Sequence, residues 1–343
     1  MNILEEDIMH IVESTLIDWK LFSNKLVMIT GGTGLIGKIL TESLIMCNEI
    51  YNYNIGVLLP VRDIKKAMEI YSKRVFDQVE VVEIDLTKIH AIKENVDIII
   101  HCAAPTQSAY FMEYPVETIR AIVQGTESIM EYARKRMCKN IVYLSSMEVF
   151  GQQFQEILYE PDLGQLSLTS LRSCYPEAKR MTELMCYSYS KEYDIPVKIA
   201  RLAQTFGPGV SLNDNRVFIQ FCKAIQNKND IILHTTGESI INYCYTTDAI
   251  LGIYRIIQAG KSGETYSVVN DDDKITIYEI AKWMIDTYGK REQTIRFDFR
   301  EETKYASQNH SKLSNDKLKT LGWEPEYSIK QGYHRLLQYF GAI

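Results

Sequence analysis

The chain has 343 residues, of which 46% are apolar and 24% are charged, and its formal net charge is −6. This charge argues against a general nucleic-acid binder, which needs a basic stripe to neutralise phosphates, but it is compatible with a local cationic pocket. Seven cysteines without a CxxC pair predict buried thiols in a reducing compartment. The chain has no apolar run of about 18 residues and an acidic N-terminus. We therefore expect a cytoplasmic protein with no membrane partner.

A helix is predicted first, over residues 3–22, and short apolar runs then alternate with amphipathic stretches. The expected strands are Leu26–Thr30, Ile55–Leu59, Val79–Ile84, Asp97–Cys102, Asn140–Ser145 and Val197–Leu202. The helices expected between them cover about residues 35–47, 62–75, 113–136 and 175–193. This alternation predicts an α/β fold of Rossmann type, with a doubly wound parallel sheet and helices on both faces.

The pattern loosens beyond about residue 205. Two short strands are expected there, at Ile231–Leu233 and Thr265–Val268. The expected helices cover about residues 216–227, 247–258, 276–288 and 328–340. We interpret this part as a smaller C-terminal α/β lobe that interleaves with the end of the sheet.

The first strand runs into TGGTGLIG and then into a helix. Gly31, Gly34 and Gly37 allow the backbone to turn tightly and to approach a pyrophosphate, which then lies on the helix N-terminus. The alternative is a plain βα turn that is rich in glycine. The context favours dinucleotide binding. We also expect the cofactor to contact three neighbours of the glycines: Thr33, Leu35 and Ile36.

The end of the second strand distinguishes NAD from NADP, because a carboxylate there binds a ribose 2′-hydroxyl and an arginine binds a 2′-phosphate. The sequence LLPVRDIKKA has no acid at the strand end, whereas Arg62, Lys65 and Lys66 follow. We therefore expect NADP. The alternative is that these are solvated charges and that Asp63 serves NAD.

Two further strand ends supply cofactor contacts. Asp85 and Leu86 follow the third strand, where we expect contact with the adenine edge. Ala103 and Ala104 follow the fourth strand, and their small side chains allow close approach of the cofactor. His101 is interpreted as a packed core histidine, and no metal site is expected.

Tyr175 and Lys179 lie four residues apart at the start of a predicted helix, with Pro176 at the first helical position. Both side chains therefore point to the same side. A lysine cation near the phenol is expected to lower its pKa, so that the phenol takes a proton from a hydroxyl as hydride leaves. Alone, the spacing is a weak signal, because such pairs are frequent on solvated helices.

The segment YLSSMEVFG ends the fifth strand at the carboxyl edge of the sheet, where open α/β sheets bind ligands. A hydroxyl of Ser145 or Ser146 is expected to hydrogen-bond the substrate oxygen beside Tyr175. The alternative for either serine is a cap at the end of the strand.

Seven segments occur in an order that resembles the extended short-chain dehydrogenases/reductases, the NAD-dependent epimerase/dehydratase group. They are TGGTGLIG, HCAA, SSMEVFG, YPEAK, RLAQTFGPG, YTTDA and KLKTLGWEP. The stretch RSCYPEAKRMTELMCYSY is most similar to the branch of UDP-glucuronate decarboxylases and sugar 4,6-dehydratases. The resemblance implies that Ser146, Tyr175 and Lys179 are catalytic. It also implies oxidation at sugar C4, chemistry on the ketone and return of the hydride.

Glu148 matches the family glutamate that acts at the carbon next to the ketone. A 4-keto group acidifies that carbon, and a carboxylate at the sheet edge is suited to take its proton. The alternative is a surface carboxylate on a strand-end loop.

The chain departs from the family pattern at four positions. Met147 stands where dehydratases carry an acid, and it cannot donate a proton to a departing hydroxyl. Ile241 stands in place of an arginine that grips the diphosphate, and Gln204 and Gly209 replace a family asparagine and arginine. These departures argue against simple 4,6-dehydration and weaken the prediction of a UDP-sugar.

Arginines elsewhere in the chain are candidates for phosphate ligands, because the guanidinium fork suits phosphate oxygens. Loop position favours Arg172 and Arg216 over Arg201 and Lys223. The predicted substrate contacts are Ser145, Met147, Gln204, Arg172 and Arg216.

We expect an N-terminal helical extension (residues 1–24), a dinucleotide-binding catalytic domain (25–204) and a substrate-binding lobe (205–343). The predicted function is NAD(P)-dependent conversion of a nucleotide sugar through a 4-keto intermediate, in surface polysaccharide biosynthesis. The alternative is an NADPH-dependent reductase of a keto-sugar or sugar phosphate, which consumes cofactor. A non-catalytic NADP sensor is less favoured, because Tyr175, Lys179 and Ser146 are all present. The resemblance also implies a homodimer through helices 113–136 and 175–193.

Overall fold

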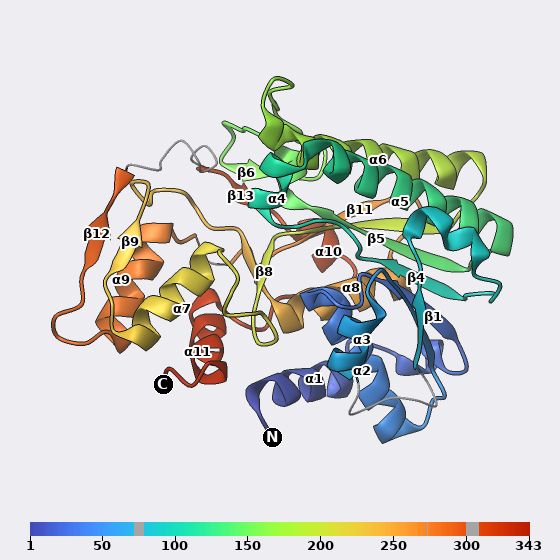
Figure 1. The fold of residues 1–343 in the computed structure, drawn as a ribbon, viewed down its shortest axis with the longest axis horizontal. Helices are drawn as coiled ribbons and strands as arrows, with labels where there is room; N and C mark the ends of the chain where they lie inside the picture. The colour runs from blue at the N-terminus through green and yellow to red at the C-terminus, as the bar shows by residue number, and fades with distance from the viewer. Residues whose placement is uncertain (72–78, 273, 300–308) are drawn as a thin grey trace.

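The computed structural model describes residues 1–71, 79–272, 274–299 and 309–343. A parallel sheet in the order β11-β7-β5-β4-β1-β2-β3 forms its centre (Figure 1). The strands are β1 (Leu26–Thr30), β2 (Gly56–Val61), β3 (Val79–Glu83), β4 (Ile98–His101), β5 (Asn140–Ser146), β7 (Val197–Leu202) and β11 (Thr265–Val268). The strand order reverses between β1 and β4, and open parallel sheets bind ligands at the carboxyl edge of such a point.

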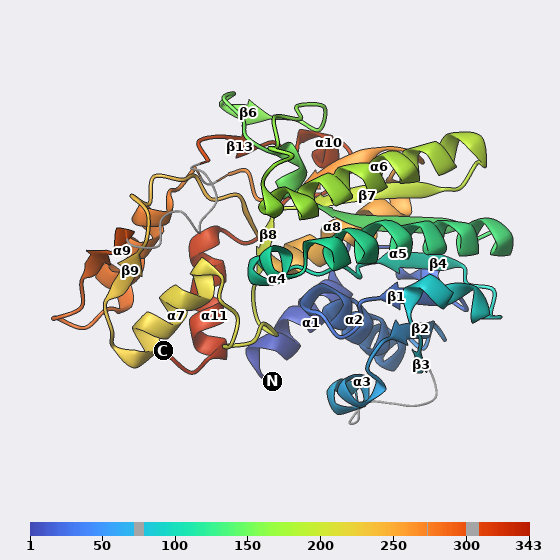
Figure 2. The ribbon, with the colours of Figure 1, turned by 45° about the horizontal axis from the view of Figure 1, so that its top comes forward.

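Helices cover both faces of the sheet. The main ones are α1 (Ile3–Glu13), α2 (Leu35–Tyr51), α3 (Ile64–Tyr71), α5 (Pro115–Arg136), α6 (Cys174–Glu192) and α8 (Thr246–Ala259). Figure 2 shows α5 and α6 side by side over one face. Met28 and Ile99 point toward that layer, whereas Val27 and Ile100 point toward α2 and α8. This alternation follows from the period of two along each strand.

A second, smaller lobe has its own apolar core. It contains α7 (Val217–Asn227), β9 (Ile231–Leu233), α9 (Ile277–Tyr288), β12 (Ile295–Phe297) and α11 (Ile329–Tyr339). Between the lobes lie the paired strands β8 (Gln204–Phe206) and β10 (Tyr243–Tyr245), and the pair β6 (Ile157–Leu158) and β13 (Lys312–Leu313). The remaining short helices are α4 (Ser108–Glu113) and α10 (Asp316–Lys319), with 3-10 turns η1 (Trp19–Phe22), η2 (Leu86–Ala91), η3 (Met147–Phe150) and η4 (Leu171–Ser173).

Helix α1 connects the two lobes. It packs on α2 and α8 of the larger layer and also contacts α11 of the smaller lobe (Figure 1). The buried carboxylate of Asp7 accepts hydrogen bonds from Tyr245 and from Arg335. Because the N-terminal segment carries a buried charge that is paired in the other lobe, it is an integral part of the fold.

The Rossmann-type fold class is confirmed, and the six strands predicted up to residue 202 are present with ends shifted by at most two residues. The helix predicted over residues 3–22 is wrong in its second half: α1 ends at Glu13, and only the short turn η1 follows. Residues 72–75 of the helix predicted over 62–75 lie outside the described residues. The division into domains stays a prediction, although β11 and α8 from beyond residue 205 pack into the larger layer.

All seven cysteines are free thiols, and six of them are buried, whereas Cys102 is half-buried. Among the described residues, no helix has the length and apolar character needed to cross a membrane.

Candidate functional site

The glycine turn after β1 is closed so tightly that side chains do not fit. Gly31 has a φ of +71°, and a Cβ there would lie 3.0 Å from the backbone of Ala103. A Cβ on Gly37 would lie 2.4 Å from the carbonyl oxygen of Gly31. The amide of Gly34 donates to the same carbonyl at 2.9 Å. These positions need glycine because backbone approaches backbone at each of them.

The N-terminus of α2 faces this turn. Its N-cap residue, Gly34, has no side chain to accept from the first N–H groups of the helix, so these donors are available to an anion. Thr33 is half-buried in the turn, and Leu35 and Ile36 pack against the core. The cradle therefore fits the pyrophosphate of a dinucleotide.

Three charged residues are expected near the adenosine end of the cofactor, and they have different partners in the structure: Arg62, Asp63 and Asp85. Arg62 is exposed just after β2, whereas the carboxylate of Asp63 accepts from the amide of Lys66 at 3.0 Å and caps α3. Asp85 accepts from the amide and the hydroxyl of Thr87, and these hydrogen bonds, helped by the charge of Arg62, lower its pKa. Arg62 therefore faces solvent at this strand end, as Asp63, Lys65 and Lys66 also do, but Asp63 is engaged in the helix cap.

The end of β4 is packed against the turn. Burial lowers the pKa of His101 to about 3, and its ring contacts the hydroxyls of Thr30 and Thr126. The interpretation of His101 as a core residue is confirmed. The amide of Ala103 donates to Thr30, and Ala104 packs in the apolar cluster that contains Tyr175. The other expected neighbour, Leu86, starts η2 and packs toward α5.

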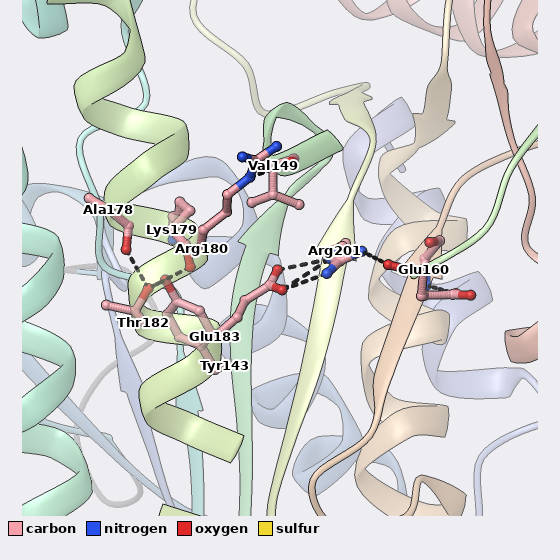
Figure 3. A network of polar contacts seen from close by, with 10 residues as sticks. Tyr143, Val149, Glu160, Ala178, Lys179, Arg180, Thr182, Glu183 and Arg201 are labelled. Carbon is pink, nitrogen blue, oxygen red and sulfur yellow. Dashed lines mark hydrogen bonds and ion pairs between the residues drawn. The ribbon is translucent and has the colours of Figure 1, made fainter. Parts of the chain in front are cut away.

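Helix α6 is joined to β5 at three successive levels. The hydroxyl of Thr182 lies 2.6 Å from that of Tyr143 (Figure 3). The ammonium of Lys179 donates to the carbonyl of Leu144 at 2.7 Å. At the strand end, the hydroxyl of Ser146 is close enough to the phenol of Tyr175 to lower its pKa. These contacts bring Ser146, Tyr175 and Lys179 together at the carboxyl edge of the sheet.

Lys179 is held in an apolar and aromatic environment. It is only 3% exposed, and its ammonium lies 4.7 Å from the ring centre of Tyr143. Burial lowers the pKa of Lys179 to about 8, although the negative charge of Glu183, one helical turn later, acts to raise it. A group with this pKa changes charge near neutral pH, as groups at functional sites often do.

The expectation that the pKa of Tyr175 is lowered is wrong for this structure. The pKa of Tyr175 is raised, first by burial and then by the charge of Glu148, whereas Ser146 and Arg172 oppose the change. The ammonium of Lys179 lies 5.9 Å from the Tyr175 ring centre and points to Leu144. Burial and the charge of Glu148 therefore set the direction of the Tyr175 pKa, and Lys179 is not among the groups that shift it.

Glu148 lies in η3, directly after β5. Its two carboxylate oxygens accept from Arg172 at 2.6 and 3.0 Å. Met147 packs against the main core, and the hydroxyl of Ser145 is buried without a hydrogen-bond partner among the described residues. Glu148 is thus the carboxylate beside Tyr175, and it is already paired.

Arg180 and Arg201 connect the segment that follows β5 to helix α6. Arg201 of β7 binds the carboxylate of Glu183 in α6 and the carbonyl of Glu160 (Figure 3). Arg180 donates to the carbonyls of Val149 and Gly164. The Arg201–Glu183 pair is almost fully buried, so Arg201 is engaged within the fold.

The remaining predicted contacts lie toward the smaller lobe. Gln204 is half-buried at the start of β8. Arg216 pairs with both carboxylate oxygens of Asp214 and lies 4.8 Å from the ring centre of Phe218. Ile241, in place of the family arginine, is buried in the core of this lobe.

Sequence reasoning missed Phe111, whose ring stacks on that of Tyr175 with centres 4.4 Å apart and an angle of 8°. It also missed the Tyr143 ring beneath Lys179 and the pairing of Arg172 with Glu148. No local motif indicates these contacts. The four-residue spacing of Lys179 and Glu183 on one helix face was a readable signal for their proximity.

Replacement of Gly37 by Ala is expected to weaken dinucleotide binding by about tenfold or more, because the added methyl meets the Gly31 carbonyl and overpacking costs roughly 1–3 kcal/mol. Titration of NAD and NADP by tryptophan fluorescence measures the dissociation constants. Gly125→Ala is the matched control, since its Cβ finds only an ordinary contact at 3.8 Å. Equal affinities of the two variants would contradict the assignment of the turn.

Comparisons with known proteins agree with this geometry. The NAD dependent epimerase/dehydratase family matches residues 27–270. UDP-glucuronic acid decarboxylase 6 of Arabidopsis thaliana is 26% identical over 315 residues, which cover 90% of this chain and 87% of that protein.

Solved structures show the same fold. The UDP-N-acetylglucosamine 4-epimerase of Methanobrevibacter ruminantium M1, in complex with UDP-N-acetylmuramic acid, has a TM-score of 0.81 at 18% identity, covering 93% of this chain and 99% of that one. The UDP-glucuronic acid 4-epimerase of Bacillus cereus, in complex with UDP-glucuronic acid and NAD, has a TM-score of 0.75 at 19% identity, covering 92% and 99%. The chain therefore belongs to the NAD-dependent epimerase/dehydratase family of enzymes.

Proposed function

We propose that the protein converts a nucleotide sugar through a 4-keto intermediate and returns the hydride to the same substrate. The observation that carries the proposal is the meeting of Ser146, Tyr175 and Glu148 at one strand end, with Lys179 one helical turn behind. A proton acceptor for a hydroxyl and a carboxylate for the neighbouring carbon are then available in a single site. The relatives' names, which include UDP-glucuronic acid decarboxylases, support a nucleotide sugar as substrate.

Each residue of the site has its own role in the proposed reaction. Ser146 orients the substrate hydroxyl by a hydrogen bond, and Tyr175 takes its proton when the alcohol becomes a ketone. A dinucleotide held at the glycine turn would supply the hydride acceptor for this step. Lys179 contributes a positive charge as long as its ammonium is protonated. Glu148 exchanges a proton at the carbon next to the ketone, while the electron pair of the broken bond moves to the ketone oxygen.

Met147 limits which net reactions this site supports. It packs against the core and has no proton to give to a leaving hydroxyl, so we propose epimerisation or decarboxylation rather than simple dehydration. The reductase alternative is favoured by one observation: Ile241 lies buried where a diphosphate contact is expected. A place in surface polysaccharide synthesis stays a prediction.

Two assays separate the alternatives. The proposed reaction yields product while the absorbance of the reduced nicotinamide returns to its starting value, since the hydride is given back. A reductase consumes one reduced cofactor for each product. Purified protein is screened with CDP-, UDP-, GDP- and dTDP-sugars beside plain sugar phosphates, with both cofactors, and product is followed by mass spectrometry.

Replacement of Tyr175 by Phe is expected to lower the turnover of the substrate found in that screen by about 10²- to 10⁴-fold, because proton transfer by the phenol is lost. Binding of the cofactor should change little. Tyr187→Phe, an exposed tyrosine on the same helix, is the matched control. Undiminished activity of Tyr175→Phe would refute the catalytic role.

The rate is expected to fall as the pH rises through about 8, the pKa of Lys179. The ammonium form is present below this pH and is lost above it, so kcat/KM should have an alkaline limb there. Lys179→Met should be slow at every pH and should lack this limb. A wild-type rate that stays constant far into the alkaline range would show that the lysine charge is not required.

For the cofactor, we propose a preference for NADP, because Arg62 is exposed at the end of β2 while Asp63 caps α3. Arg62→Ala is expected to weaken NADP binding by about tenfold or more, the value of a hydrogen bond to a charged group, without a change for NAD. Arg291→Ala, an exposed arginine of the other lobe, is the control. Tighter binding of NAD than NADP by the unaltered protein would overturn the preference.

We also propose a homodimer. Exposed apolar side chains lie on α5 and α6, the helices that the resemblance implicates. They are Val116, Ile119, Met181, Leu184 and Tyr187. Burial of these side chains against a second copy would remove apolar surface from water.

A further inference from the structure

The carboxylate of Glu148 is gripped by a residue from a different element. Arg172 lies in η4, just before the catalytic helix, and its two terminal nitrogens donate one to each oxygen of Glu148, at 2.6 and 3.0 Å. A bidentate pair of this kind fixes the direction of a carboxylate as well as its charge. The direction of the Glu148 carboxylate therefore depends on Arg172.

Arg172 is linked to Tyr175 through the ring of Phe111. Its guanidinium lies 5.5 Å from the ring centre of Phe111, and Phe111 stacks on Tyr175. The guanidinium, the phenyl ring and the phenol thus form a chain of contacts from Glu148 to Tyr175. The carboxylate and the phenol are set relative to each other through this chain.

The pair is not a buried structural bridge. The side chains of Arg172 and Glu148 are 30% and 28% exposed, and exposed ion pairs contribute little to stability. The position of the pair beside Tyr175 instead gives it an electrostatic role. The charge of Glu148 raises the pKa of Tyr175, and the charge of Arg172 lowers it.

We propose that Arg172 is a positioning residue that fixes the direction of the Glu148 carboxylate and shields Tyr175 from its charge. This inference rests on the proposed function, because it takes Glu148 as the group that exchanges the proton next to the ketone. The other charged or titratable groups near the pair are Tyr175, the thiol of Cys174 and, on α6, Arg180, which holds the carbonyl of Val149. None of them grips the carboxylate as Arg172 does.

The test follows two steps of the reaction separately. Transient reduction of the cofactor reports oxidation at C4, and uptake of solvent deuterium at the neighbouring carbon reports the work of Glu148. In Arg172→Gln, deuterium uptake is expected to slow by about tenfold or more, because the carboxylate loses the two-pronged contact that fixes its direction. Arg172→Lys keeps the charge without the fork and should recover only part of the rate. C4 oxidation should persist in both variants.

Arg134→Gln is the matched control, because Arg134 grips Glu131 in the same two-pronged way at a similar exposure on α5. It should leave the rate of deuterium uptake unchanged. Glu148→Gln should abolish deuterium uptake while C4 oxidation continues.

The outcomes separate the inference from the proposed function. A rate of deuterium uptake that stays unchanged in Arg172→Gln, or one that falls equally in Arg134→Gln, overturns the role of Arg172 alone. If the unaltered protein shows neither C4 oxidation nor deuterium uptake with any sugar nucleotide, the proposed function fails and this inference fails with it.

Discussion

The alignment of α6 along β5 determines where the chemistry of this protein takes place. Thr182 meets Tyr143, Lys179 meets Leu144 and Tyr175 meets Ser146, so the helix and the strand run in opposite directions with their polar groups matched. A shift of the helix by one residue would turn the tyrosine away from the strand end, since successive residues point in different directions. The buried contacts of Lys179 and Thr182 therefore keep Tyr175 at the edge of the sheet.

The same edge carries the dinucleotide cradle, because all seven strands of the central sheet are parallel and their carboxyl ends lie together. The glycine turn follows β1 and Ser146 ends β5, with β4 between them. Closely packed backbone makes the turn rigid, as the contact between Gly31 and Ala103 shows. Rigid elements hold reacting groups more exactly than loops do. Glu148 and Arg172 lie in the short turns η3 and η4, and their pairing joins these two turns.

Much of this arrangement was predictable from local sequence. Apolar runs marked the strands of the sheet, and Gly31, Gly34 and Gly37 marked the turn, because backbone constraints act over a few residues. Contacts between distant segments were not predictable: Phe111 reaches Tyr175, and Arg172 reaches Glu148, without any periodic signal. The pKa of Tyr175 was predicted in the wrong direction because desolvation depends on the whole surrounding fold. The paired strands β6 and β13 were missed because a two-residue strand has no detectable alternation.

The central claim is that a dinucleotide bound at the glycine turn reaches the tyrosine held on β5. A crystal structure of the protein with bound NADP or NAD tests it most directly. The account predicts the pyrophosphate at the N-terminus of α2 and the reactive nicotinamide ring in contact with Tyr175. A nucleotide bound elsewhere, or a nicotinamide separated from Tyr175 by the ring of Phe111, would contradict it.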